Sequence, residues 1–330
     1  MYKLCFFIIV IFTSIVAVCH YREQKDYPVD LVYLWVDGDD SNWLEKKTFW
    51  QKKYGKLPEN GTHVARFRQF DELKYSLRSI EKNIPWINHI YIVTDNQIPS
   101  WLANHPKITI VNHTDIFPKD ALPIFNSAAL EVRIPYIPNL SEHFLFANDD
   151  CYIRVPLEKS FFFDEKTHNP RVFVKYKRRT YDTNLWLAQI QKAHQLIAQK
   201  YPLDFVITPA HNIQAYRKSY YIDALNEFNE ESTQTTYSKF RQETDLNRII
   251  VELRDRMKNQ NHMYSKWDTS AIPSTCKTAF SLISSDFHTL YKEQPCLFCL
   301  NDFEGKTNQQ INITLQILEN LFPEKSSFEK

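Results

Sequence analysis

Carboxylate and amide side chains follow two apolar stretches of this chain. The run Phe144–Ala147 leads directly into Asn148–Asp150, and the stretch PCLFCL leads into Asn301 and Asp302. Oxygen ligands grouped in this way could hold Mg²⁺ or Mn²⁺, with the diphosphate of a substrate completing the coordination shell. A cation bound there would neutralise charge on a phosphoryl or leaving group. The alternative interpretation is that each acidic group belongs to an ordinary turn.

Two other residues have side chains suited to phosphate and hydroxyl chemistry. His211 lies in the loop TPAHN, where an imidazole could take a proton from a hydroxyl group, although a single histidine is more often structural. Arg241, in SKFRQETD, could bind a phosphate group, or it could pair on the surface with Glu243 or Asp245. Residue types alone leave both alternatives open.

The composition limits how this chain could bind a phosphate. Its formal net charge is +1, so composition indicates neither a nucleic acid nor a membrane surface as a partner. The chain has 4 glycines against 16 prolines and contains neither GxGxxG nor GxxxxGK. A phosphate-binding site must therefore use helix N-termini, basic side chains or a metal ion.

The elements that would position these residues form a repeated pattern in the first half of the chain. Four apolar runs rich in β-forming residues, at 29–36, 90–93, 108–111 and 143–147, each end in Asp or Asn and are separated by helix-compatible stretches. This pattern predicts an α/β fold with a Rossmann-like, mainly parallel sheet that has helices on both faces. Ligands bind beyond the carboxyl ends of such strands. Four acidic residues should therefore gather at one edge: Asp37, Asp95, Asp149 and Asp150.

The second part of the chain is more helical. Apolar residues at helical spacing predict helices over 71–84 and 127–137 in the first half, and over 185–200, 214–228, 242–257 and 308–322 in the second. Residues 41–70 are basic and polar and are expected to form a loop with a short helix.

The N-terminus predicts entry into the secretory pathway. Residues 4–19 carry no charge and follow a short basic lead, which suits a signal anchor or a signal peptide, followed by a polar stem to residue 28. Residues 1–28 would then be the targeting region and 29–330 the catalytic domain. We expect a lumenal domain on the Golgi or ER membrane, or a secreted protein if the segment is cleaved. Four sequons are compatible with a lumenal chain: Asn60, Asn112, Asn139 and Asn312.

The cysteines favour a disulfide over a zinc site. Four lie outside the apolar N-terminal segment, namely Cys151, Cys276, Cys296 and Cys299. The last two form a single CxxC with no second pair nearby, which is weak evidence for zinc. In a lumenal compartment a disulfide is expected, with its partners undetermined.

Four blocks of the sequence resemble the Stealth family of hexose-1-phosphate transferases. That family includes capsular polysaccharide phosphotransferases and the lysosomal-enzyme N-acetylglucosamine-1-phosphotransferase of animals. The first block, at about 29–40, is VDLVYLWVDGDD, and the second, at about 66–155, includes FDELKYSLRSIEKNIPWINHIYIVTDNQIPSWL and ends in EHFLFANDD. The third, at about 205–250, contains TPAHNIQAYRKS and SKFRQETDLN, and the fourth, at about 295–305, contains CLFCLNDFEG.

The resemblance implies a reaction and its partners. A sugar-1-phosphate, such as N-acetylglucosamine-1-phosphate or another hexose-1-phosphate, would pass from a nucleotide sugar, typically UDP-linked, to a hydroxyl of an acceptor glycan or glycoprotein. A phosphodiester forms and the nucleoside monophosphate leaves. The membrane would be a further partner through the N-terminal segment if that segment stays attached, and no nucleic acid is implied.

The resemblance also implies which residues form the site. The catalytic set is His211, Arg241, Asp37, Asp149 and Asp150, and the metal ligands for Mg²⁺ or Mn²⁺ come from Asp149, Asp150 and Asp302. The substrate-binding set is Arg78, Asp71, Glu72, Asn126, Ser127, Glu131, Asn148, Asp245 and Asn301. The chain departs from the family after His211, where it reads Asn-Ile-Gln and the family often has further Pro and His residues.

These residues lead to a mechanistic hypothesis with two alternatives. His211 would act as base on the acceptor hydroxyl, while Arg241 and the metal would stabilise charge at the β-phosphorus. One alternative is a metal-dependent glycosyltransferase of similar architecture, which cleaves the sugar C–O bond instead. The other is a non-catalytic glycan-binding relative, which would lack the paired Asp, His and Arg groups that this chain retains.

Overall fold

The computed structural model describes residues 27–176, 184–259, 261–283 and 287–330. The predicted signal segment and most of the stem lie outside these ranges. Among the helices within them, none is long and apolar enough to cross a membrane.

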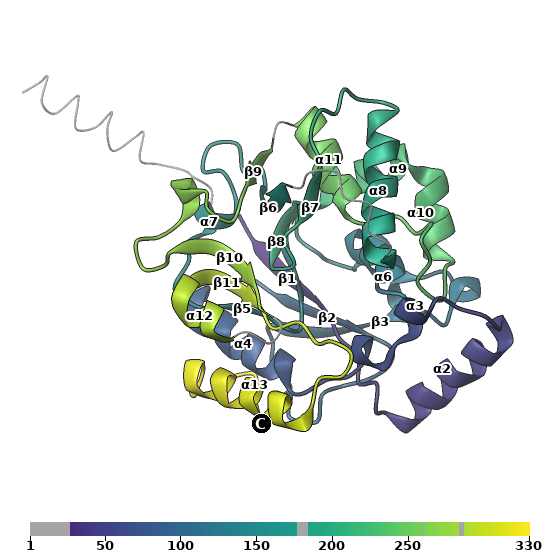
Figure 1. Cartoon of the computed structure of the whole chain (residues 1–330), viewed down its shortest axis with the longest axis horizontal. Helices are drawn as coiled ribbons and strands as arrows, with labels where there is room; N and C mark the ends of the chain where they lie inside the picture. Colours follow the sequence, from purple (N-terminus) through teal and green to yellow (C-terminus); the bar gives the residue numbers. More distant parts are fainter. Residues whose placement is uncertain (1–26, 177–183, 260, 284–286) are drawn as a thin grey trace, which may run out of the picture.

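A five-stranded sheet in the order β3-β2-β1-β4-β8 forms the centre of the molecule (Figure 1). The strands β1 (Val29–Leu34), β2 (Ile90–Thr94), β3 (Ile108–Asn112) and β4 (His143–Asn148) are parallel, and β8 (Gln214–Arg217) runs antiparallel to β4. Every residue of β1 and β2 is buried, as expected for strands covered on both faces. The predicted α/β fold with a mainly parallel sheet is confirmed.

Helices cover both faces of this sheet. On one face Leu73 and Leu77 of α4 (Glu72–Asn83) pack in the same core as the β1 residue Tyr33. On the other face, α6 (Ser127–Arg133), α8 (Leu185–Ala198) and α11 (Ile249–Lys258) pack against the alternate side chains of β1 and β4. Because successive side chains of a strand point to opposite faces of the sheet, the apolar residues of each strand are divided between two cores.

Two three-stranded sheets flank the central one. The first, β10-β11-β5, joins β10 (Thr278–Leu282), β11 (Pro295–Cys299) and β5 (Cys151–Ile153). The second, β7-β6-β9, joins β7 (Ile207–Pro209), β6 (Arg171–Tyr176) and β9 (His262–Tyr264). Because β5 begins right after Asp150, the chain crosses from the central sheet to the first small sheet at the acidic pair.

The structure contains the disulfide that the cysteines favoured, and it identifies the two partners. Cys276 and Cys296 form a disulfide that ties the start of β10 to β11. Cys151 and Cys299 face each other across β5 and β11 as buried free thiols.

Three predicted elements differ in the structure. The helix expected over 214–228 is β8 followed by α9 (Lys218–Glu227), because Gln214 bonds the backbone of Phe173 and fixes an extended strand beside β4. The helix expected over 242–257 begins only at Ile249, since Asp245 accepts the Gln242 N–H and forms a turn. Residues 41–70 contain a longer helix than expected, α2 (Ser41–Tyr54).

The described residues also form several short elements and further helices. They are α3 (Glu59–Thr62), η1 (Val64–Arg66), α5 (His113–Ile116), η2 (Lys119–Ala121), η3 (Ile134–Tyr136), α7 (Lys159–Phe162), α10 (Asn229–Thr236), η4 (Thr269–Ala271), α12 (Phe287–Glu293) and α13 (Asn308–Leu321).

Candidate active site

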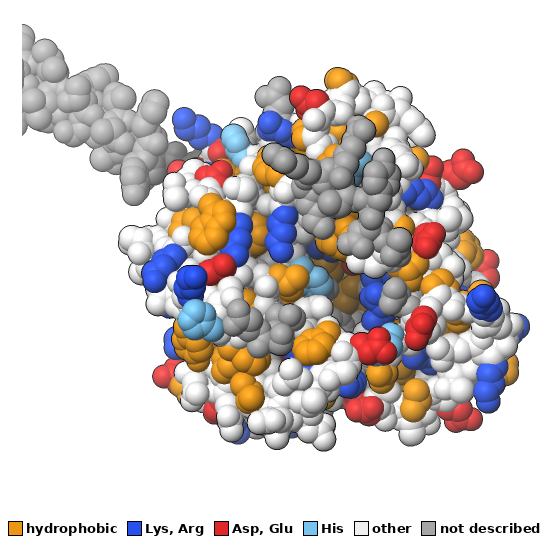
Figure 2. All heavy atoms as spheres, viewed as in Figure 1, with side chains coloured by type: hydrophobic (Ala, Val, Ile, Leu, Met, Phe, Trp, Pro, Cys, Tyr) orange, Lys and Arg blue, Asp and Glu red, His pale blue; other side chains and the backbone are white. Residues whose placement is uncertain are grey.

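A cavity of about 410 Å³ opens at the carboxyl edge of the central sheet. All four parallel strands contribute to its lining, through Trp35 after β1, Asp95 after β2, His113 after β3 and Asn148 at the end of β4. The face shown in Figure 2 is hollowed near its middle. The volume of the cavity lies in the range of small-molecule sites, and the cavity lies where open α/β sheets bind ligands.

One wall of the cavity is acidic. Asp149 and Asp150 lie in the turn between β4 and β5, and Glu72 begins α4 and accepts the N–H of Phe70. Burial, then the neighbouring Asp150 and Glu72, raise the pKa of Asp149 well above its ordinary value. Burial is also the main reason that the pKa of Glu72 rises to about 7. Carboxylates crowded in this way repel one another, so a cation between them would be favourable.

The acidic wall fits a divalent metal ion. Asp149 and Asp150 supply hard oxygen ligands of the kind that Mg²⁺ and Mn²⁺ use together with substrate phosphates. Ligand atoms of Asp150, His211 and Cys299 also lie within 4.8 Å of one another and could hold a metal ion. Burial raises the pKa of the Cys299 thiol well above its usual value, which disfavours the thiolate that metal binding needs.

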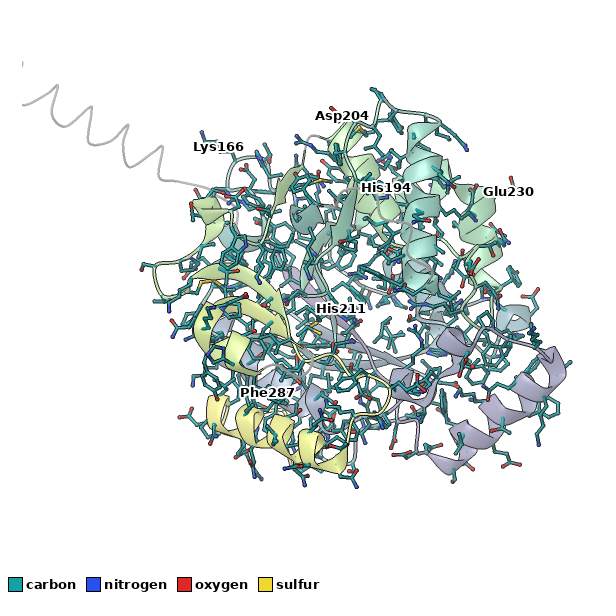
Figure 3. All side chains as sticks on the ribbon, viewed as in Figure 1. Lys166, His194, Asp204, His211, Glu230 and Phe287 are labelled. Carbon is teal, nitrogen blue, oxygen red and sulfur yellow. A yellow bond between two sulfur atoms is a disulfide. The ribbon has the colours of Figure 1, made fainter. Side chains whose placement is uncertain are left out.

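His211 lies between the sheets near the centre of the view in Figure 3. Its Nε2 atom is 2.9 Å from the side-chain amide of Asn148, a contact that orients the ring. Burial lowers the pKa of the imidazole below its usual value, against an opposing effect of Asp150. The ring is therefore neutral at neutral pH and able to accept a proton.

Asp302 is held by cations. Its Oδ2 atom accepts from both Nε and Nη2 of Arg68, at 3.0 and 2.8 Å, and its Oδ1 atom lies 3.9 Å from the ammonium group of Lys306. Asn301 donates its amide to the backbone carbonyl of Asp302. Asp302 lines the cavity, but much of its charge is already compensated.

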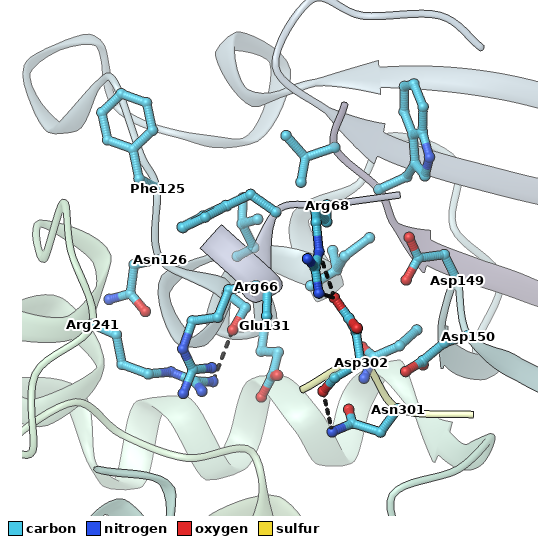
Figure 4. A pocket seen from close by; sticks show the side chains of 18 of the residues that line it. Arg66, Arg68, Phe125, Asn126, Glu131, Asp149, Asp150, Arg241, Asn301 and Asp302 are labelled. Carbon is cyan, nitrogen blue, oxygen red and sulfur yellow. Dashed lines mark hydrogen bonds and ion pairs between the residues drawn. The ribbon is translucent and has the colours of Figure 1, made fainter. Parts of the chain in front are cut away.

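The opposite wall is basic (Figure 4). Arg241 donates from Nη2 to the hydroxyl of Ser127 at 2.8 Å. Arg66 projects into the same part of the cavity, and Arg248 lies with Nη1 3.6 Å from Oε1 of Glu131. Guanidinium groups at a cavity wall are suited to binding phosphate.

Asn126 and Asp245 support this basic wall. Asn126 caps α6 by accepting the Ala128 N–H at 3.0 Å, and its amide donates to Asp245 at 2.8 Å. Asp245 does not itself line the cavity. It acts on the site by holding Asn126.

Several residues in the predicted site lie outside the lining. The carboxylate of Asp71 pairs with Lys74 at 2.7 Å, and the backbone of Asp37 bonds the side chain of Gln97. Arg78 binds both oxygens of Glu329 near the C-terminus, each at 2.8 Å. The structure brings the other predicted residues to the cavity: Glu72, Asn126, Ser127, Glu131, Asn148, Asp149, Asp150, His211, Arg241, Asn301 and Asp302.

Sequence reasoning missed three arginines of the site. Arg66, Arg68 and Arg248 all line the cavity. The first two lie in the basic segment before α4, which shows no periodicity that would have marked them. Their neighbours in space, Arg241 and Asp302, are far away in sequence.

Two segments of the chain that contribute to this site match family models of known proteins. Residues 27–55 match the family model described as Stealth protein CR1, conserved region 1, and residues 66–171 match Stealth protein CR2, conserved region 2. These two segments contain the acidic turn and the N-terminus of α6.

Similar curated proteins are polysaccharide phosphotransferases. The capsular polysaccharide phosphotransferase fcs1 of Haemophilus influenzae is 33% identical over 316 residues, covering 89% of this chain and 84% of that protein. The exopolysaccharide phosphotransferase SCO6023 of Streptomyces coelicolor is 31% identical, and this chain spans only 53% of its length. The capsular polysaccharide phosphotransferase SacB of Neisseria meningitidis serogroup A is 31% identical, with 58% of its length spanned.

Solved structures are more distant. The galactosyltransferase LgtC, in complex with donor and acceptor sugar analogs, aligns with 91% of this chain and 97% of its own at 10% identity and a TM-score of 0.43. A likeness of that size carries no conclusion about function.

Proposed function

Because the chain belongs to the Stealth family, whose curated members matched above are polysaccharide phosphotransferases, we propose that it transfers a sugar-1-phosphate from a nucleotide sugar to a hydroxyl group of an acceptor glycan. The donor is a UDP-sugar, and the transferred group is N-acetylglucosamine-1-phosphate or another hexose-1-phosphate. The acceptor oxygen forms a bond to the β-phosphorus, and the bond from that phosphorus to the nucleoside monophosphate breaks.

One observation carries the proposal. Residues from distant parts of the chain give the cavity an acidic wall with Asp149 and Asp150, a basic wall with Arg241, and the neutral imidazole of His211. Phosphoryl transfer needs these three functions, because charge on phosphate must be stabilised while a hydroxyl loses its proton.

Each residue then has a role in the reaction. Nε2 of His211, which accepts from the side-chain amide of Asn148, takes the proton of the acceptor hydroxyl once that hydroxyl replaces the amide. Arg241, held by Ser127, stabilises negative charge on the phosphate oxygens. Asp149 and Asp150 would hold a divalent cation, which when bound neutralises charge on the diphosphate.

Product analysis tests the proposal and separates it from glycosyl transfer. The full chain is incubated with UDP-sugars, Mg²⁺ or Mn²⁺ and simple glycans, and the products are read by mass spectrometry. Release of UMP with phosphate retained in the glycan product is expected, whereas release of UDP would establish the glycosyltransferase alternative. His211→Ala and Arg241→Ala should abolish transfer, while His262→Ala, which alters an exposed histidine outside the cavity, should not.

We also propose that the catalytic domain is lumenal. The disulfide between Cys276 and Cys296 supports an oxidising compartment. Asn139 and Asn312 are exposed sequon residues. Expression in a eukaryotic secretory host should therefore give a chain whose mass falls on endoglycosidase treatment, and an unglycosylated chain retained in the cytosol would contradict the proposal.

A further inference from the structure

Four side chains with metal-binding atoms meet at the acidic wall of the cavity. Ligand atoms of Asp150, His211 and Cys299 lie within 4.8 Å of one another. The thiol of Cys151 adds a fourth group, because its Sγ atom is 3.7 Å from Oδ1 of Asp150. Asp150 and His211 line the cavity, whereas both cysteines are fully buried. A cation in the cavity would therefore meet the oxygen and nitrogen ligands first and the sulfur ligands behind them.

The small sheet β10-β11-β5 brings the two sulfur atoms together. Cys151 of β5 lies opposite Cys299 of β11 in an antiparallel pair of strands. Leu300 donates its N–H to the carbonyl of Asp150 at the next position of the ladder, so Cys151 and Cys299 form a non-hydrogen-bonded pair. Side chains approach each other most closely at such pairs. Burial, then a hydrogen bond with Cys151, raises the pKa of the Cys299 thiol well above its usual value, which places the two thiols in contact.

The spacing of these ligands suits a tetrahedral zinc ion. Zn–S bonds are about 2.3 Å and Zn–O bonds about 2.0–2.2 Å, so a sulfur and an oxygen bound to the same zinc ion lie about 3.6 Å apart. The distance of 3.7 Å between Cys151 Sγ and Asp150 Oδ1 is close to that value. Because the other ligand atoms lie within 4.8 Å of one another, they would have to draw together by about 1 Å at most.

The types of these ligands select a thiophilic cation. Zn²⁺ binds thiolate, imidazole and carboxylate groups, whereas Mg²⁺ takes oxygen ligands. Burial keeps the thiols of Cys151 and Cys299 protonated, so each thiol must release its proton to solvent as its bond to zinc forms. The CxxC motif itself plays no part in this set, since Cys296 is bonded to Cys276.

We propose that Asp150, Cys151, His211 and Cys299 bind Zn²⁺ or another thiophilic divalent cation, and that this cation inhibits the enzyme. The binding does not depend on the proposed function, whereas the inhibition rests on it. Zinc bound at this site occupies the imidazole that takes the proton of the acceptor hydroxyl. It also occupies one of the two carboxylates assigned to the catalytic metal ion.

The absorption of bound cobalt tests for sulfur ligands without requiring turnover. The untagged full chain is purified without reductant, so that the disulfide between Cys276 and Cys296 stays closed, and is treated with a chelator. Alkylation of the unfolded chain with peptide mapping then shows whether Cys151 and Cys299 are free thiols. Co²⁺ replaces Zn²⁺ in such sites, and its bond to a thiolate gives a charge-transfer absorption in the near ultraviolet. Zinc affinity is measured by displacement of the cobalt.

Two cysteine variants and one control identify the ligands. The variants are Cys151→Ala and Cys299→Ala, and the control His262→Ala removes an exposed histidine outside the cavity. We expect the thiolate absorption in the wild type and the control, and a smaller absorption in both cysteine variants. Zinc affinity should fall about 100-fold for each lost thiolate, as for a zinc site whose affinity is shared among four ligands. Melting temperatures establish that each variant is folded.

Three results would overturn the site. They are a disulfide between Cys151 and Cys299 in the purified chain, no thiolate absorption in the wild type, and wild-type zinc affinity in a folded cysteine variant.

UMP release at constant Mg²⁺ and increasing Zn²⁺ tests the inhibition separately. Zinc should inhibit the wild type, and Cys299→Ala should need about 100-fold more zinc for the same fractional loss of its own rate. Undiminished UMP release with zinc bound would overturn the inhibitory role. If the wild type shows thiolate absorption but releases no UMP, the proposed reaction is wrong and the metal site stands. If it releases UMP but shows no thiolate absorption, the metal site is wrong and the reaction stands.

Discussion

The close approach of Gly61 to the backbone of Arg241 predicts that an added methyl group at position 61 will lower the proposed transfer rate. In Gly61→Ala the new Cβ would lie 2.9 Å from the Arg241 backbone oxygen, where ordinary contacts begin at 3.4 Å. The segments must therefore separate by about 0.5 Å. Active-site groups tolerate displacements of about that size at most, and a 1 Å misplacement can cost about 100-fold in rate. We expect the transfer rate of Gly61→Ala to fall roughly tenfold.

Global stability should change much less than the rate. Overpacking costs about 1–3 kcal/mol, but alanine is better than glycine in a helix by about 1 kcal/mol, and Gly61 lies in α3. The two effects partly offset each other. The matched control is Gly55→Ala, because nothing lies within 4 Å of its Cβ but its φ is +71°. A left-handed alanine costs about 1–2 kcal/mol, so this variant should melt earlier at an unchanged transfer rate.

The assay is UMP release at saturating donor, paired with thermal unfolding of each variant. The two alanine variants should show opposite patterns, with Gly61→Ala impaired mainly in rate and Gly55→Ala impaired mainly in stability. A wild-type transfer rate in Gly61→Ala would refute the idea that this contact positions Arg241.

Three further predictions concern stability. Burial raises the pKa of Asp255 to about 8, so this carboxyl contributes stability that is full below its unfolded pKa near 3.8 and lost as the pH rises through 8. Asp255→Asn should remove a slope of up to about 1.4 kcal/mol per pH unit from unfolding measured across that window, and an unchanged slope would contradict the assignment. Arg78→Ala removes the cation that pairs with the Glu329 carboxylate, whose side chain is 4% exposed, and leaves it the N–H and hydroxyl of Ser326; this should cost about 3–5 kcal/mol in denaturant unfolding. The transfer rate of that variant should be retained, and a folded but inactive variant would restore Arg78 to the site. Cys276→Ser opens the disulfide to Cys296 and should cost about 3 kcal/mol, with the reduced wild type equally destabilised and the variant insensitive to reductant.

The central sheet could be predicted from local patterns in the sequence. The strands around Leu31 and Leu145 are continuous apolar runs, as expected for strands that are covered on both faces. The acidic residues that follow these strands indicate the edge of the sheet at which the cavity lies. The helix expected over 214–228 failed because tertiary contacts of Gln214 override helical spacing. No local signal distinguishes an edge strand of four residues from the first turn of the helix that follows it.

The same difference between local and distant contacts separates the correctly predicted site residues from the others. Asp149, Asp150 and His211 reach the cavity because they follow strands whose direction the sequence pattern indicates. Arg78 instead donates to Glu329, which lies 251 positions later in the chain. No helical spacing could indicate this partner. Arg66 reaches the cavity for an equally non-local reason, since the backbone contact of Gly61 with the Arg241 loop holds its segment there.

The separation of charge across the cavity depends on the bond between Arg68 and Asp302. Asp302 follows the small sheet that contains β5, and β5 begins directly after Asp150, so this carboxylate is fixed relative to the acidic wall. Arg68 lies two residues from Arg66, and its bidentate hold on one oxygen of Asp302 ties the basic segment to that sheet. Any cation bound by Asp302 would have to use Oδ1, for which Lys306 at 3.9 Å competes. The geometry therefore favours Asp302 as the link between the two walls, and Asp149 and Asp150 remain the carboxylates that we propose as metal ligands.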